Sequence, residues 1–265
     1  MPLLFEKETH LLRRCFFKVQ NEVGLGRHEA AYHRACVMWF EEHRLPVVSK
    51  APHRLLLRGD EANILYPDFV GWNAISVELK SVPRHLARTE LVQLFDYLKC
   101  RRDRVGLLVN MGLDRVEIER VAYDPPETEF FENWDNWTDR IDGEDGAIGY
   151  AAREALRAVA AEHTTGYGEG VLMKLVLCAL RQQGLSATLN PVAKAFYRGA
   201  EVHESALECV VINERVVLAL SSLCDTNQFN LNRCRSYLRT LGLHWGIAAD
   251  FGKKRAEIIG TRTQG

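Results

Sequence analysis

The sequence predicts an α/β protein made of two tandem copies of one unit, each with a mixed central sheet flanked by helices. Two observations predict this. Stretches with apolar residues at helical spacing alternate with short strand-like runs, an order typical of helices packed on a sheet. The same order then returns in the second half of the 265-residue chain at a nearly constant offset of 140 positions.

The first copy opens with two helix patterns, the first ending at a glycine and the second lying between Gly26 and Pro46. Three short strand candidates follow, then a third helix and two further strands. The helices are expected at residues 8–24, 27–45 and 87–102, and the strands at 53–59, 62–70, 74–80, 104–112 and 115–123.

The repeat is visible in aligned stretches. The turn sequence LRG at 57–59 returns as YRG at 197–199, and YLKCRRDRVGLLVNMG at 97–112 aligns with YLRTLGLHWGIAADFG at 237–252. PDFVGWNAISVELKS at 67–81 aligns with LECVVINERVVLALS at the same offset. One offset held over such stretches predicts an internal duplication; two unrelated α/β domains with coincidental matches are the alternative.

Charge divides the chain into three parts. Residues 1–123 carry a net charge of +3 and residues 147–265 a net charge of +4, whereas 124–146 contain nine acids and one base. We therefore expect domains at 1–123 and 147–265, joined by an acidic, aromatic-containing linker at 124–146. The linker either forms an ordered strap, because its aromatic residues need burial, or shades a basic cleft. The mild basicity of both halves permits nucleic-acid binding.

Other features exclude several classes of protein. The longest apolar run is short and interrupted by Lys174, so no membrane span is expected. The N-terminus lacks the pattern of a signal peptide, which predicts a cytoplasmic protein. Seven cysteines without a CxxC pair indicate neither a disulfide framework nor a zinc site.

Charges interrupt the apolar hairpin YPDFVGWNAISVELK at 66–80. Strand alternation places Glu78 and Lys80 on one face, and a turn about Trp72 would put Asp68 opposite Ser76 on that face. Two carboxylates so close repel each other, and a divalent cation such as Mg²⁺ would relieve the repulsion. A surface ion pair between Glu78 and Lys80 is the simpler alternative.

Five motifs in order resemble one known family. They are GRHEAAY at 26–32, PD at 67–68, VELK at 77–80, QLFDYLK at 93–99 and GLLVNMG at 106–112. Residues 8–123 are thereby similar to the GxxExxY proteins of the PD-(D/E)XK nuclease superfamily, close to its RecB-like branch. The resemblance implies two restriction-endonuclease-like units and a nuclease that depends on Mg²⁺ or Mn²⁺, acting on DNA in preference to RNA.

The resemblance also implies roles for individual residues. Asp68 and Glu78 match the metal-binding carboxylates, Lys80 the catalytic lysine, and Glu29 a helix glutamate that supports the metal site. The carbonyl of Leu79 would be a further ligand. Taken alone, Glu29 could be an acid that favours a helix N-terminus.

The helix that follows carries the QxxxY pattern as Gln93 and Tyr97, which the resemblance assigns to supporting the site and the bound strand. Their i,i+4 spacing puts them on one side of the helix; a solvated glutamine and a core tyrosine are the alternatives. Arg84 and Arg88 could contact phosphates or simply form a solvated basic loop. Glu90 stands where the family often has a histidine, which leaves the local charge open.

The second copy lacks these groups. An offset of 140 places Glu208, Leu218 and Leu220 at the positions of Asp68, Glu78 and Lys80, with Arg233 at that of Gln93. Aliphatic side chains neither bind Mg²⁺ nor transfer protons, so this copy is expected to be degenerate. It could pack against the first unit and offer a basic wall of Arg233, Arg235, Arg239 and residues 253–255; a structural remnant with solvated arginines is the alternative. A non-catalytic scaffold that binds nucleic acid or protein is the alternative function for the whole chain.

Overall fold

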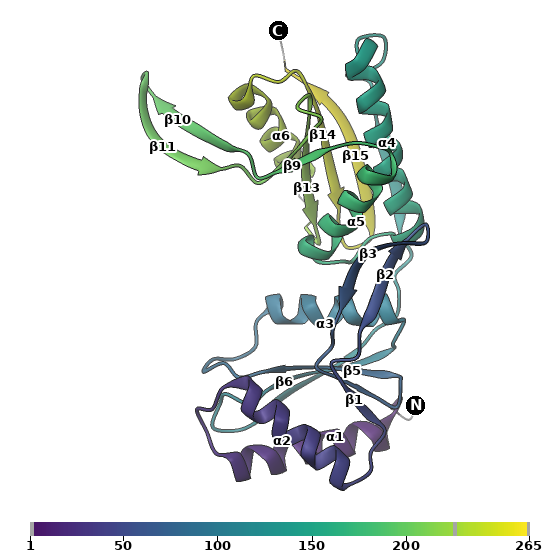
Figure 1. Ribbon diagram of the computed structural model, residues 1–265, viewed down its shortest axis with the longest axis vertical. Helices are drawn as coiled ribbons and strands as arrows, with labels where there is room; N and C mark the ends of the chain where they lie inside the picture. Colours follow the sequence, from purple (N-terminus) through teal and green to yellow (C-terminus); the bar gives the residue numbers. More distant parts are fainter. Residues whose placement is uncertain (1–2, 225–226, 264–265) are drawn as a thin grey trace. The chain divides into compact units, whose positions relative to one another are not determined.

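The computed structural model describes residues 3–224 and 227–263 and divides into two compact units (Figure 1). Unit 1 comprises residues 1–55 and 64–125, and unit 2 comprises residues 56–63 and 126–265. The short segment Leu56–Asn63 therefore lies within the first copy of the repeat but belongs to unit 2. The domain bounds expected at 123 and 147 stay a prediction.

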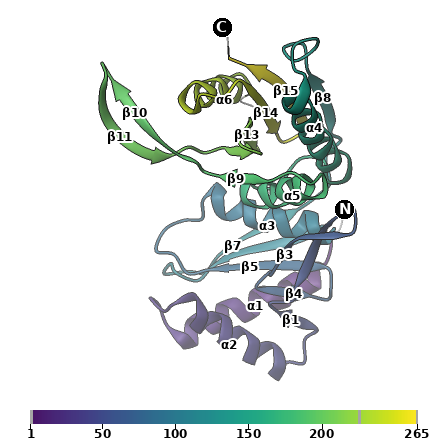
Figure 2. The same ribbon diagram turned by 45° about the horizontal axis from the view of Figure 1, so that its top comes forward.

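Unit 1 is a three-layer arrangement around a mixed five-stranded sheet. The sheet order is β1-β4-β5-β6-β7, with β5 and β6 parallel and the other pairs antiparallel. Helices α1 and α2 lie on one face and α3 on the other (Figure 2). The elements are α1 Glu6–Val23, α2 Glu29–Glu42, β1 Val47–Ser49, β4 Phe69–Gly71, β5 Ile75–Lys80, α3 Arg88–Arg101, β6 Val105–Asn110 and β7 Glu117–Ala122.

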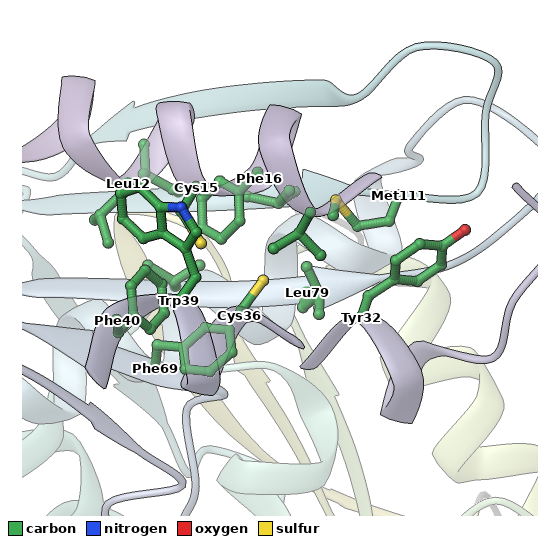
Figure 3. Close-up of a cluster of buried hydrophobic side chains, with 14 of the residues drawn as sticks. Leu12, Cys15, Phe16, Tyr32, Cys36, Trp39, Phe40, Phe69, Leu79 and Met111 are labelled. Atoms are coloured by element: carbon green, nitrogen blue, oxygen red, sulfur yellow. The ribbon is translucent and has the colours of Figure 1, made fainter. Parts of the chain in front are cut away.

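Alternation along the central strands fills both layers. Leu107 of β6 belongs to the core beneath α1 and α2, and its neighbour Leu108 to the core beneath α3. The first of these cores is aromatic-rich: Phe16 and Phe40 pack edge to face with ring centres 6.5 Å apart, and Trp39 lies beside Phe40 (Figure 3). This packing fixes α2, whose first residue is Glu29, against the sheet.

The structure differs from the expected order of strands in one region. Residues 53–65 form a separate two-stranded sheet, β2 His53–Leu57 with β3 Asp60–Leu65, instead of joining the central sheet. The strand expected at 62–70 breaks at Pro67, which has no N–H for the ladder. The three-residue strand β1, which periodicity did not indicate, occupies the edge next to β4.

Unit 2 repeats the architecture around a six-stranded sheet of order β8-β15-β14-β13-β12-β9. The duplication and the α/β class are thus confirmed. Its elements are β8 Glu129–Asn133, α4 Gly143–His163, α5 Glu169–Gln182, β9 Ala187–Leu189, β10 Val192–Tyr197, β11 Ala200–Ala206, β12 Val210–Ile212, β13 Val216–Ser222, α6 Asn227–Leu241, β14 Trp245–Phe251 and β15 Arg255–Arg262.

The acidic segment is ordered within unit 2. Strand β8 pairs in parallel with β15, and Trp137 is fully buried with its Nε1 donating to the carbonyl of Thr261 at 2.9 Å. A Cβ atom at Gly149 would lie 2.5 Å from the Trp137 ring, so the helix approaches the indole closely only because glycine stands there. Phe130 and Phe131 remain exposed. Over the residues that the structure describes, no helix has the length and apolarity to cross a membrane.

Candidate active site of unit 1

The β4–β5 hairpin brings two acids together. Its register pairs Phe69 with Val77, so the next position pairs Asp68 with Glu78 rather than with Ser76 as expected. The turn centre lies one residue later than Trp72, and a shift of two positions keeps both acids on the expected face. Both side chains are buried, and Asp68 Oδ2 accepts the backbone N–H of Leu79 at 2.8 Å.

A chain of polar contacts links this hairpin to α3. Lys80 Nζ donates to Glu78 Oε1 and, at 3.0 Å, to Gln93 Oε1. Gln93 Nε2 donates to the hydroxyl of Tyr97 at 2.7 Å, and that hydroxyl donates to the carbonyl of Tyr66 at 3.3 Å. Gln93 and Tyr97 lie one turn apart on α3, so Tyr97 can hold Gln93 in place. Gln93 in turn contacts the Lys80 ammonium, which also contacts Glu78.

The surroundings of Glu78 move its pKa toward neutral pH. Burial raises its pKa, the charge of Asp68 raises it further, and the hydrogen bond from Lys80 lowers it, with a net pKa of about 7. Its second oxygen, Oε2, is buried and has no hydrogen-bond partner within the described part of the chain. A buried carboxylate oxygen without a donor is costly unless a cation or a proton satisfies it.

Three side chains that the sequence analysis missed surround Asp68. Lys50 Nζ lies 2.6 Å from Asp68 Oδ1, His33 Nε2 lies 3.3 Å from the Asp68 carbonyl, and Ser49 Oγ is 3.2 Å from the same His33 nitrogen. Burial opposes the charge on Lys50, but the hydrogen bond and charge of Asp68 outweigh it and raise the Lys50 pKa. Lys50 follows a three-residue edge strand, too short for periodicity to reveal.

Glu29 and Asp68 line one pocket. The pocket, of about 360 Å³, is lined by Glu29, Asp68, His33, Lys50 and neighbouring residues of α2. Burial raises the pKa of Glu29, and the charge of Asp68 adds to this. Helix α2 delivers Glu29 from its first turn, which the hydroxyl of Tyr32 anchors by donating to the carbonyl of Gly24 at 2.7 Å.

The two arginines after β5, Arg84 and Arg88, differ in whether their side chains are already paired with an acid among the described residues. Arg84 pairs with Glu90 at 2.5 Å, whereas Arg88 is exposed at the start of α3. Glu90 also accepts the N–H of Ala87 at 2.8 Å, so it caps the helix instead of entering the site. The hydrogen bonds from Arg84 and Ala87 lower the Glu90 pKa to about 2.

The acidic groups partly fit a divalent ion. Asp68 and Glu78 supply two carboxylates, and the buried Glu78 Oε2 is an oxygen that a cation could bind, which suits the one or two carboxylates that Mg²⁺ takes from proteins. Among the described residues, however, no three His, Cys, Asp or Glu side chains lie close enough to hold a metal as a group. A metal ion at Asp68 would have to replace the Lys50 ammonium.

In unit 2 the positions equivalent to Asp68, Glu78 and Lys80 are one residue further along than expected. Lys50 N donates to the Asp68 carbonyl, and Asn190 N donates to the Cys209 carbonyl in the same way. The extra residue enters at a bulge in β11, where the partners of Ala195 and Phe196 are His203 and Glu201.

This shift corrects the side chains at the second site. In the strand register, Cys209, Ala219 and Ser221 replace Asp68, Glu78 and Lys80, instead of Glu208, Leu218 and Leu220. None of the three is a carboxylate or an ammonium group.

The comparisons with known proteins agree with this geometry. A family model described as the PD-(D/E)XK nuclease superfamily matches residues 6–121 and, a second time, residues 147–261. The chain therefore belongs to the PD-(D/E)XK nuclease superfamily, with two copies of the family's unit. No match was found in a search of the curated proteins or in one of the solved structures.

Proposed function

We propose that unit 1 is a Mg²⁺- or Mn²⁺-dependent nuclease that hydrolyses phosphodiester bonds, with DNA as the favoured substrate. The observation that carries this proposal is the buried Asp68–Glu78 pair, in which one carboxylate oxygen has no hydrogen-bond donor among the described residues and the pKa of Glu78 rises to about 7. Perturbed acids beside a lysine are typical of catalytic sites. Membership of a nuclease superfamily supports the same reaction class.

The residues divide into binding and positioning roles. Asp68 and Glu78, with the carbonyl of Leu79 and support from Glu29, would hold the metal, which when bound supplies charge neutralisation at the phosphate. Lys80 holds the attacking water or offsets charge developing on the phosphate. Gln93 positions Lys80 through their 3.0 Å hydrogen bond, and Tyr97 positions Gln93.

The exposed side of the site offers weaker contacts to a nucleic acid. Arg88 is available for a phosphate, whereas Arg84 must first leave Glu90. The Gly26–Tyr32 segment supports a place in the GxxExxY group and the RecB-like branch, because Tyr32 anchors the turn that carries Glu29. That finer placement is part of this proposal.

The test is a nuclease assay on labelled single- and double-stranded DNA and RNA, with Mg²⁺, Mn²⁺ or EDTA. We expect metal-dependent cleavage that Lys80→Ala abolishes and Lys18→Ala leaves unchanged. Lys18 is a matched control because it is a surface lysine of α1, paired only with Glu22 in the ion pairs found for the described residues. Cleavage retained in Lys80→Ala, Asp68→Ala and Glu78→Ala would refute the assigned site.

A non-catalytic nucleic-acid-binding scaffold is the second candidate, and one observation favours it. Lys50 already neutralises Asp68 at 2.6 Å, as a cation would. Titration calorimetry with Mn²⁺ separates the two functions. An enzyme binds Mn²⁺ and loses that binding in Asp68→Asn, whereas a scaffold whose Asp68 stays paired with Lys50 shows no heat from that site.

A further inference from the structure

The two copies contain an equivalent hairpin, in which the residue before the turn is buried in the first copy and exposed in the second. In each copy, a two-residue turn with positive φ at both positions joins the strands: Arg58 and Gly59 at 50° and 90°, Arg198 and Gly199 at 51° and 82°. This shared turn aligns β2 with β10 at an offset of 140 and makes Tyr197 the equivalent of Leu57. Leu57 is fully buried, whereas Tyr197 is 62% exposed.

The tip of the first hairpin is docked on the ends of two helices of unit 2. The N–H of Arg58 donates to Glu162 Oε2 at 2.9 Å, and His163 Nε2 lies 2.7 Å from the Leu56 carbonyl at the end of α4. At the end of α5, Gln182 Nε2 donates to the Leu57 carbonyl and to Asp60 Oδ2, both at 2.9 Å. The C-terminal ends of α4 and α5 together thus bind the tip of this hairpin.

The second hairpin, residues 192–206, extends from the side of unit 2 as an arm (Figure 1). Its apolar side chains are unusually open to solvent: Val192, Phe196, Tyr197 and Val202 are between 60% and 63% exposed. Exposed aromatic and β-branched residues gathered on one short element are typical of an interaction surface, and tyrosine is enriched at such surfaces.

Unit 1 has helix ends at the equivalent positions, although Val23 and Glu42 there lack the donor groups of His163 and Gln182. Helices α1 and α2 end at Val23 and Glu42, the residues 140 positions before the ends of α4 and α5. Glu22 stands at the position of Glu162, with its side chain 64% exposed, and can accept the Arg198 N–H as Glu162 accepts that of Arg58. Met38, one turn before Glu42, is 64% exposed, whereas its equivalent Cys178 is 4% exposed.

We infer that the arm docks its tip, residues 196–199, on the α1–α2 ends of a second copy of this chain. Tyr197 then takes the place that Leu57 has in unit 2, beside Met38, and the Arg198 side chain faces the acids Glu22 and Glu42. This contact joins different surfaces of the two copies, so it is head-to-tail and can continue from chain to chain. This inference does not depend on the proposed function.

Sedimentation over a range of concentrations tests this contact, using two complementary variants and a control. The arm variant is Phe196→Ser with Tyr197→Ser, and the receptor variant is Glu22→Arg with Met38→Glu. Phe229→Ser is the matched control, because Phe229 is 67% exposed in unit 2 but lies on α6. All these positions are on the surface, so circular dichroism melts should show intact folds.

The wild type and the control should show a mass that rises with concentration above the 30.2 kDa of one chain. Each variant alone should stay at the mass of one chain. An equimolar mixture should form dimers but nothing larger, because the receptor variant retains an arm and the arm variant retains a receptor. A wild type that stays monomeric, an arm variant that still assembles, or a mixture that stays monomeric would each overturn the inference.

Discussion

Replacing Glu78 by glutamine should remove a pH dependence from the stability of unit 1. In the absence of metal, burial and Asp68 raise the pKa of Glu78 from its usual 4.5 to about 7. An acid whose pKa is raised by folding stabilises the fold fully below pH 4.5, and this contribution is lost as the pH rises through 7. At 1.36 kcal/mol per pH unit, the loss reaches about 3 kcal/mol above pH 7.

Glutamine keeps the shape of the neutral acid and does not ionise. Glu78→Gln should therefore match the wild type at acidic pH and exceed its free energy of unfolding by up to about 3 kcal/mol at mildly alkaline pH. Urea titrations in the presence of EDTA, with hydrogen exchange in peptides that cover β5 and β6 as the readout, report on unit 1 alone. This matters because a chain with two units need not unfold in one step.

Glu90 of the same unit is a control, because folding lowers its pKa whereas it raises that of Glu78. Arg84 and the Ala87 N–H lower the pKa of Glu90, so its contribution is present at neutral pH and is lost on acidification. Glu90→Gln should thus be the less stable variant at neutral pH and should approach the wild type in acid. If the difference between Glu78→Gln and the wild type does not change with pH, the electrostatic reasoning for this site is wrong.

Three further predictions concern other contacts. Lys50→Met should increase Mn²⁺ affinity by about fivefold in calorimetry, because it removes the exposed ammonium that competes for the buried Asp68 in an ion pair worth about 1 kcal/mol; unchanged or weaker binding would contradict this. Trp137→Ala should lower the stability of unit 2 by about 3–5 kcal/mol in the same exchange experiment, because it empties a fully buried indole site; a loss below 1 kcal/mol would show that the segment is dispensable. Arg235 and Arg239 line a pocket of about 260 Å³ that has no carboxylate among its lining residues; changing both to alanine should reduce the salt dependence of DNA binding, measured by fluorescence anisotropy at several salt concentrations, and an unchanged slope would remove them from the interface.

The geometry of the candidate site shows where sequence reasoning succeeds. Local alternation along β5 puts Glu78 and Lys80 on one face whatever strand lies beside it, and helical spacing does the same for Gln93 and Tyr97. These inferences use only covalent geometry, and the structure agrees with both. The face of Asp68 was predicted correctly even though its partner in the hairpin was not.

Long-range pairing is where sequence reasoning fails. Lys50 reaches Asp68 only because β1 pairs with β4, and a three-residue edge strand carries no periodic signal. The second site was misaligned by one residue because a bulge in β11 changes the register without leaving a gap that short motifs reveal.

By itself, the sequence determined the α/β class, the internal duplication, the superfamily and the acids of one hairpin, since periodicity and motif order are properties of contiguous residues. Tertiary structure decided which strands enter each sheet, which cation neutralises Asp68, and that residues 56–63 belong to unit 2. It also decided that Leu57 is buried and Tyr197 exposed, although both stand before the same turn. Burial and charge pairing depend on partners distant in the chain, and only the fold selects those partners.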